Sequence, residues 1–109
     1  MKKGFKTNIE RQTAKNKHFR EIIYTAHHCQ LVLMSLLPRE EIGVETHTEG
    51  DQFFRFESGA GRVIINKSTY SVKAGDAVIV PAGAKHNIIN TSRTKPLKLY
   101  TIYAPPHHQ

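Results

Sequence analysis

The chain has 109 residues, of which 39% are hydrophobic and 23% are charged, a composition typical of one ordinary globular domain. No apolar run approaches the roughly 20 residues that a membrane-spanning helix needs, so we expect no membrane partner. The single cysteine excludes an internal disulfide, and we expect a cytoplasmic protein.

The formal net charge of +7 is concentrated at the N-terminal end of the chain. Residues 1–20 carry seven Lys or Arg against one Glu, a balance of +6. The other 89 residues carry nine Lys or Arg against eight Asp or Glu, a balance of +1. Residues 1–17 also lack useful periodicity, so we predict a basic, poorly ordered tail and no specific nucleic-acid partner.

From Phe19 onward, short runs rich in β-branched and aromatic residues alternate with turn-forming residues. Many short strands at such spacing predict an all-β sandwich or barrel, and we expect one domain over residues 18–109. The predicted strands are 21–25, 30–37, 52–57, 61–66, 69–72, 77–80, 86–90 and 97–104.

Side-chain alternation along the strand at 52–57 assigns its two faces. Arg55 marks the outer face, so Gln52, Phe54 and Phe56 are predicted to lie on the inner face. A buried amide needs a partner, which makes Gln52 a candidate site residue. The residues predicted to line the core or a pocket are Phe54, Phe56, Ile88 and Asn90.

The segment from residue 75 to residue 90 carries the most specific motif of the chain. It has a glycine, five residues, Pro-x-Gly, two residues, a histidine, three residues and an asparagine. These positions hold Gly75, Pro81, Gly83, His86 and Asn90. The pattern resembles the second motif of the cupin family, whose histidine binds metal. The resemblance covers roughly residues 30–104 and implies a jelly-roll barrel, also called a double-stranded β-helix.

The first cupin motif is matched in part. That motif usually supplies His-x-His and then a glutamate, and all three bind metal together with the histidine of the second motif. Here His47 fills the first place, Glu49 stands where the second histidine would be, and Gln52 stands near the usual glutamate. The resemblance therefore implies a metal site formed by His47, Glu49, Gln52 and His86.

The chemistry of these side chains also favours one divalent metal ion. His47 and Glu49 share a face of an extended segment because side chains repeat every two residues. Two imidazoles, a carboxylate and an amide oxygen form a mixed nitrogen and oxygen set that suits Zn, Fe(II), Mn, Ni or Co. The alternative is a metal-free barrel in which both histidines hydrogen-bond internal polar groups or water.

Three functions fit such a site. The sequence resembles small cupins often labelled as relatives of mannose-6-phosphate isomerase, which implies a metal-dependent enzyme that isomerises a sugar, a sugar phosphate or a related small polar acid. Glu49 is the candidate base, and Tyr100 or Tyr103 is the candidate acid. The alternatives are a metal-dependent dioxygenase, whose ligands resemble two histidines and a carboxylate, and a non-catalytic barrel that binds or senses a small molecule.

The remaining histidines are expected to lie at the surface or to serve in packing. His107 and His108 follow two prolines at the end of the chain, and we predict that both are mobile and incidental to the site. Cupins commonly pair, so we expect a homodimer with an interface that includes residues 31–37 and Phe53. The other histidines assigned to surface or packing roles are His18, His27 and His28.

Overall fold

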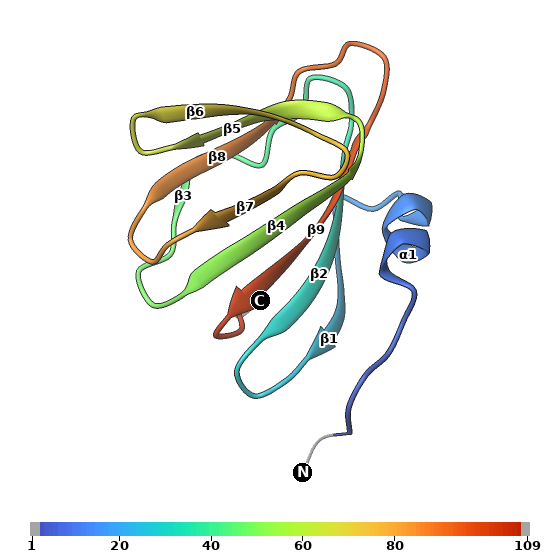
Figure 1. Cartoon of the computed structure of the whole chain (residues 1–109), viewed down its shortest axis with the longest axis vertical. Helices are drawn as coiled ribbons and strands as arrows, with labels where there is room; N and C mark the ends of the chain where they lie inside the picture. Colours follow the sequence, from blue (N-terminus) through green and yellow to red (C-terminus); the bar gives the residue numbers. More distant parts are fainter. Residues whose placement is uncertain (1–2, 108–109) are drawn as a thin grey trace.

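Alternating apolar side chains organise the chain into strands that pair in two antiparallel sheets (Figure 1). The computed structural model describes residues 3–107. Its elements are α1 (Ile9–Lys15), β1 (Arg20–Thr25), β2 (Gln30–Leu36), β3 (Glu45–Thr46), β4 (Asp51–Ser58), β5 (Ala60–Ile65), β6 (Ser68–Lys73), β7 (Ala77–Val80), β8 (Lys85–Asn90) and β9 (Leu97–Ala104).

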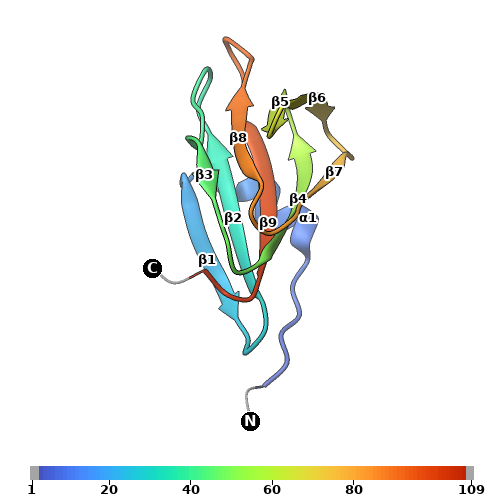
Figure 2. The same ribbon diagram turned by 90° about the vertical axis from the view of Figure 1, so that its left-hand side faces the viewer.

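The strands form a jelly roll, which confirms the predicted all-β fold. One sheet has the order β1-β2-β9-β4-β7 and the other has the order β3-β8-β5-β6. The view turned by 90° shows β3 and β8 lying over β2 and β9 (Figure 2). Inward side chains of both sheets form one core, whose largest fully buried members include Phe54, Phe56, Leu36, Ile88, Leu97 and Leu99.

Strand β2 is apolar on both faces because each face is covered. Val32, Met34 and Leu36 belong to the central core. Leu33 points the other way, toward the end of α1, and is only 3% exposed. Part of the run that we expected at a dimer interface is therefore buried within the chain itself.

Residues 9–15 form the helix α1, so this part of the basic N-terminal segment is not the poorly ordered tail that the sequence predicts. The Asn8 side chain caps the helix by accepting the Arg11 N–H at 3.0 Å. Lys98 on β9 donates to the carbonyls of Ala14 and Asn16 at 2.7 and 2.9 Å, where a cation stabilises the helix end. The helix therefore depends on a contact from the far end of the chain.

The helix packs against β2, β4 and β9, on the side of the five-stranded sheet away from β8 (Figure 1). It leaves the space between the sheets open to other side chains. None of the helical segments within residues 3–107 has the length and apolar character that a bilayer crossing requires.

Asn90, at the end of β8, is a structural residue. It is fully buried, and its Nδ2 donates to the carbonyls of Leu36, Leu37 and Lys95 at 2.9 to 3.1 Å. Its Oδ1 accepts the Ser92 N–H at 3.0 Å. One side chain thus holds the loop before β9 against the end of β2.

We predict that Asn90→Ala lowers the free energy of unfolding by about 3 kcal/mol, because it leaves several buried backbone groups without a partner. Urea denaturation followed by circular dichroism measures the change. The control is Ser71→Ala, which truncates an exposed side chain on β6 and should change stability by less than about 0.5 kcal/mol. Equal stability of the two variants would contradict the structural role of Asn90.

Candidate metal centre

The pairing of β3 with β8 brings a carboxylate opposite the motif histidine. Glu45 and His86 are direct cross-strand partners, so their side chains leave the same face of the sheet. The chain before β3 is held along β8 by a bond from Ile42 N–H to the Ile88 carbonyl at 2.9 Å. Gly43 adds a second bond, from its N–H to the Asn87 side-chain oxygen at 2.8 Å. This short strand therefore has a fixed register.

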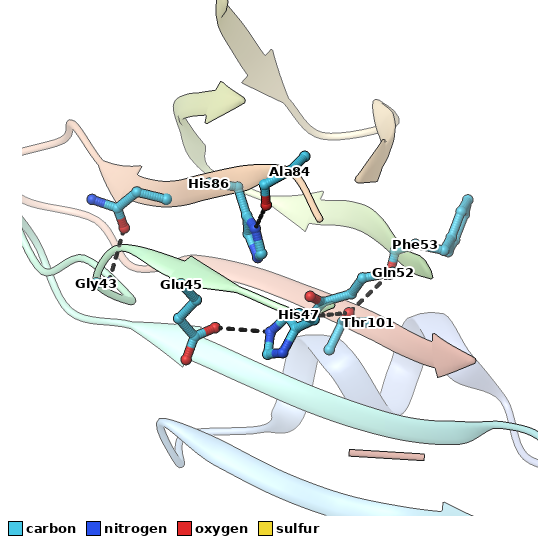
Figure 3. A network of polar contacts seen from close by, with 9 residues as sticks. Gly43, Glu45, His47, Gln52, Phe53, Ala84, His86 and Thr101 are labelled. Atoms are coloured by element: carbon cyan, nitrogen blue, oxygen red, sulfur yellow. Dashed lines mark hydrogen bonds and ion pairs between the residues drawn. The ribbon is translucent and has the colours of Figure 1, made fainter. Parts of the chain in front are cut away.

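Glu45, His47 and His86 form a cluster that could hold a metal ion (Figure 3). One ligand atom from each residue lies within 4.8 Å of the others. The Glu45 Oε1 and His47 Nε2 atoms are 3.3 Å apart. The carboxylate oxygen can only accept at this separation, so either His47 Nε2 carries a hydrogen or a metal ion lies between the two atoms.

The histidine of the second motif is oriented by its own loop. His86 is 4% exposed, and its Nδ1 lies 3.0 Å from the Ala84 carbonyl, which can only accept a hydrogen bond. Nδ1 therefore carries the proton, and Nε2 presents a lone pair. This Nε2 is buried and has no hydrogen-bond partner among the described residues. A ring nitrogen that donates to a carbonyl while the other stays open is typical of metal-binding histidines.

Gln52 presents an amide oxygen in the same manner. Its Nε2 donates to Thr101 Oγ1 at 3.0 Å, and that hydroxyl donates to the Phe53 carbonyl at 2.9 Å. These bonds fix the amide, whose Oε1 is buried without a partner within residues 3–107. Figure 3 shows Gln52 beside His47. Two imidazole nitrogens, a carboxylate and an amide oxygen therefore fit a divalent ion of the Zn, Fe(II), Mn, Ni or Co type.

The loop of the second motif is tied to the segment that carries the first. Gly83 donates its N–H to the His47 carbonyl at 2.8 Å, and Ala82 donates its N–H to Asp51 Oδ1 at 2.9 Å. Gly83 has φ of +87°, a conformation that residues with a Cβ rarely adopt. The Pro-x-Gly turn thus sets the position of His47 relative to His86.

Two hollows that share lining residues adjoin the cluster. The outer cavity measures about 260 Å³ and the inner cavity about 110 Å³. Both are lined by Gln52, Tyr103 and His107. His47 lines the outer cavity and His86 the inner one, so the candidate ligands stand between the two.

Tyr103 is placed to donate a proton or a hydrogen bond in this cavity. It is 7% exposed, and burial raises the pKa of its hydroxyl above the usual range. The neighbouring Arg20 guanidinium lowers that pKa, but burial dominates, so the phenol is protonated at neutral pH. Tyr100 points to the other face of β9, against the Phe53 ring, so it does not reach the site.

The structure does not bring Glu49 to the cluster, and Glu45 supplies the carboxylate instead. Both residues satisfy the two-residue alternation with His47. The difference is that β3 ends at Thr46 and the chain bends at residues 48–49, so Glu49 is exposed at the rim of the outer cavity. The same alternation, applied backward from His47, would have found Glu45.

The predicted pocket-lining residues divide into two pairs. Phe54 and Ile88 line the inner cavity. Phe56 is fully buried in the core, and Asn90 holds backbone, so neither lines either cavity.

His107 is part of the site rather than incidental to it. Its ring stacks on Tyr103 with centroids 5.0 Å apart and contacts the His47 ring edge-on at 4.7 Å. Gly50 allows this approach, because a Cβ there would lie 2.7 Å from the Ala104 carbonyl oxygen. His108 lies outside the described residues.

Comparison with known proteins supports this architecture. Residues 32–103 match the family model described as a cupin domain. The chain is 48% identical to YrkC of Bacillus subtilis (strain 168) and 46% identical to L612 of Acanthamoeba polyphaga mimivirus. The alignments include 97% and 93% of this chain, which spans 60% and 65% of the lengths of these two relatives.

Two solved structures show the same fold. BH2720 of Bacillus halodurans is 42% identical and superposes with a TM-score of 0.95, over 98% of this chain and 85% of that one. TT1209 of Thermus thermophilus is 25% identical, with a TM-score of 0.77 over 91% of this chain and 95% of that one. The chain belongs to the cupin family.

Proposed function

We propose that this protein is a metal-dependent enzyme that acts on a small polar metabolite, such as a sugar, a sugar phosphate or a related acid, by an isomerase-like proton transfer. One observation carries the proposal. Three buried polar atoms, His47 Nε2, His86 Nε2 and Gln52 Oε1, have no hydrogen-bond partner among the described residues, and the Glu45 carboxylate lies within 4.8 Å of a ligand nitrogen of each histidine. Buried acceptors cost free energy unless something binds them, and a divalent ion satisfies all of them together.

The bound ion would act as a Lewis acid that polarises a carbonyl or binds neighbouring hydroxyls of the substrate. The chain supplies the other parts. Tyr103 holds a proton at its hydroxyl and can give it to a substrate oxygen in the cavity. Phe54 and Ile88 form an apolar wall that limits water on the inner side. Glu49, at the rim of the outer cavity, remains the candidate base.

A second candidate is a dioxygenase. Two histidines and one carboxylate, the set formed by His47, His86 and Glu45, are typical of non-haem Fe(II) sites that activate O₂. Assays of the metal-loaded protein against a panel of polar metabolites distinguish the two. Product formation without O₂ uptake supports isomerisation, and iron-dependent O₂ uptake supports the second candidate. Binding without any product would contradict both and leave a binding barrel.

We predict that purified protein contains metal in close to stoichiometric amount and that His47→Ala, His86→Ala removes it. Elemental mass spectrometry of untagged protein measures the content. The control is His27→Ala, His28→Ala, which removes two exposed histidines outside the cluster and should leave the metal in place.

The control separates the site from adventitious binding. If both double variants lose metal equally, metal binding does not depend on the cluster. If the site variant retains its metal, the ion lies elsewhere. Either result would contradict the proposed centre. Circular dichroism of each variant checks that the fold is intact.

The two glutamates give a sharper prediction. We expect Glu45→Gln to weaken metal binding at least about tenfold, since it removes the charge of a ligand. Glu49→Gln removes the same charge at the rim and should change the affinity by less than about threefold, because exposed charges are screened by solvent. Competition with a chelating dye measures both. A larger loss of metal affinity in Glu49→Gln than in Glu45→Gln would instead support the ligand set that the cupin motif implies, in which Glu49 supplies the carboxylate.

A further inference from the structure

Arg20 is a cation in the inner cavity that the motifs do not predict. It is the first residue of β1 and pairs with Met34 on β2, and both side chains line the inner cavity. The same cavity is lined by Glu45 and His86. The arginine thus lies beside the candidate metal centre, although it comes from a strand outside both motif segments.

The Arg20 guanidinium is only partly satisfied. Its Cζ lies 5.7 Å from the centre of the Tyr103 ring, which is within the range of a cation–π contact. The Nη2 atom is buried and has no hydrogen-bond partner in the described part of the chain. A buried donor of a charged group in this state is costly.

Arg20 also lacks an anionic partner. Among residues 3–107, no carboxylate lies within 4.0 Å of it, whereas Arg55 has Glu57 at 3.6 Å. Glu45, the acid that shares the cavity, is directed to His47 and belongs to the metal cluster. When an ion occupies that cluster, the positive charge of Arg20 has no counter-charge in the cavity.

We propose that Arg20 binds the carboxylate or phosphate group of an anionic ligand in the inner cavity. The role of that ligand as a substrate rests on the proposed function. The binding of the anion rests on Arg20 alone. A carboxylate and a phosphate each present two neighbouring oxygens that can accept two parallel N–H bonds from one guanidinium. Lysine offers a point charge without this fork. Tyr103, on which Arg20 lies, can donate to the same group.

The test is calorimetric titration with inorganic phosphate and, separately, with malonate. Each is titrated into metal-loaded and into EDTA-treated protein, so that the arginine is tested with and without the ion. The variants are Arg20→Gln, Arg20→Lys and the control Arg62→Gln, which removes an exposed arginine from β5 and changes the net charge equally. Metal content is measured on every sample.

We expect at least one of the two anions to bind, and Arg20→Gln to weaken that binding about ten- to hundredfold without loss of metal. Arg20→Lys should fall between Arg20→Gln and the unchanged protein, and Arg62→Gln should bind as the unchanged protein does. The anion that binds more tightly identifies the group that the cavity prefers.

Three results would overturn the inference. They are an equal affinity in Arg20→Gln, an equal loss in Arg62→Gln, and the absence of binding of either anion by the unchanged protein at millimolar concentration. If the protein holds no metal but EDTA-treated protein binds an anion through Arg20, the proposed metal enzyme fails and the anion site stands. If Arg20→Gln does not fold, Arg20→Lys decides the matter by the same criterion.

Discussion

The bond from Gly83 N–H to the His47 carbonyl is the contact on which the site depends, because it joins the two motif segments. The pairing of Glu45 with His86 fixes one carboxylate opposite one imidazole. It does not by itself position His47, which follows the end of β3. The turn before β8 supplies that constraint, and the Ala84 carbonyl within it also orients the His86 ring. A single tight turn therefore sets both the distance between the imidazoles and the tautomer of one of them.

The sequence predicts the parts of the site that depend on local spacing. The second motif places His86 after its turn, and alternation along β4 places Gln52 inside, as the structure shows. Alternation could not decide between Glu45 and Glu49, since the choice depends on where β3 ends. Arg20 carries no spacing signal at all, because its partner Tyr103 is distant in sequence and adjacent only through β2 and β9. The helix α1 was not predicted either, because Lys98, which holds the end of the helix, is distant from it in sequence.

Unsatisfied polar atoms are concentrated where a ligand would bind. Of the seven buried side-chain atoms without a partner in residues 3–107, four belong to Arg20, His47, Gln52 and His86. The other three belong to Thr13, Arg55 and Glu57, whereas the buried Asn90 side chain has four backbone partners. A chain that leaves several polar atoms unpaired in one cavity accepts a loss of stability there, which is typical of functional sites.

The unpaired Arg20 guanidinium explains why a glutamine suits position 52. Gln52 and Arg20 line the inner cavity together with Tyr103. A glutamate at position 52, as the first cupin motif usually has, would place a carboxylate near the guanidinium and neutralise it as an internal ion pair. The amide keeps an oxygen for the metal while it leaves the charge of Arg20 uncompensated. With a divalent ion, the Glu45 carboxylate and Arg20 counted together, the cavity has an excess of two positive charges, which favours a ligand that brings its own negative charge.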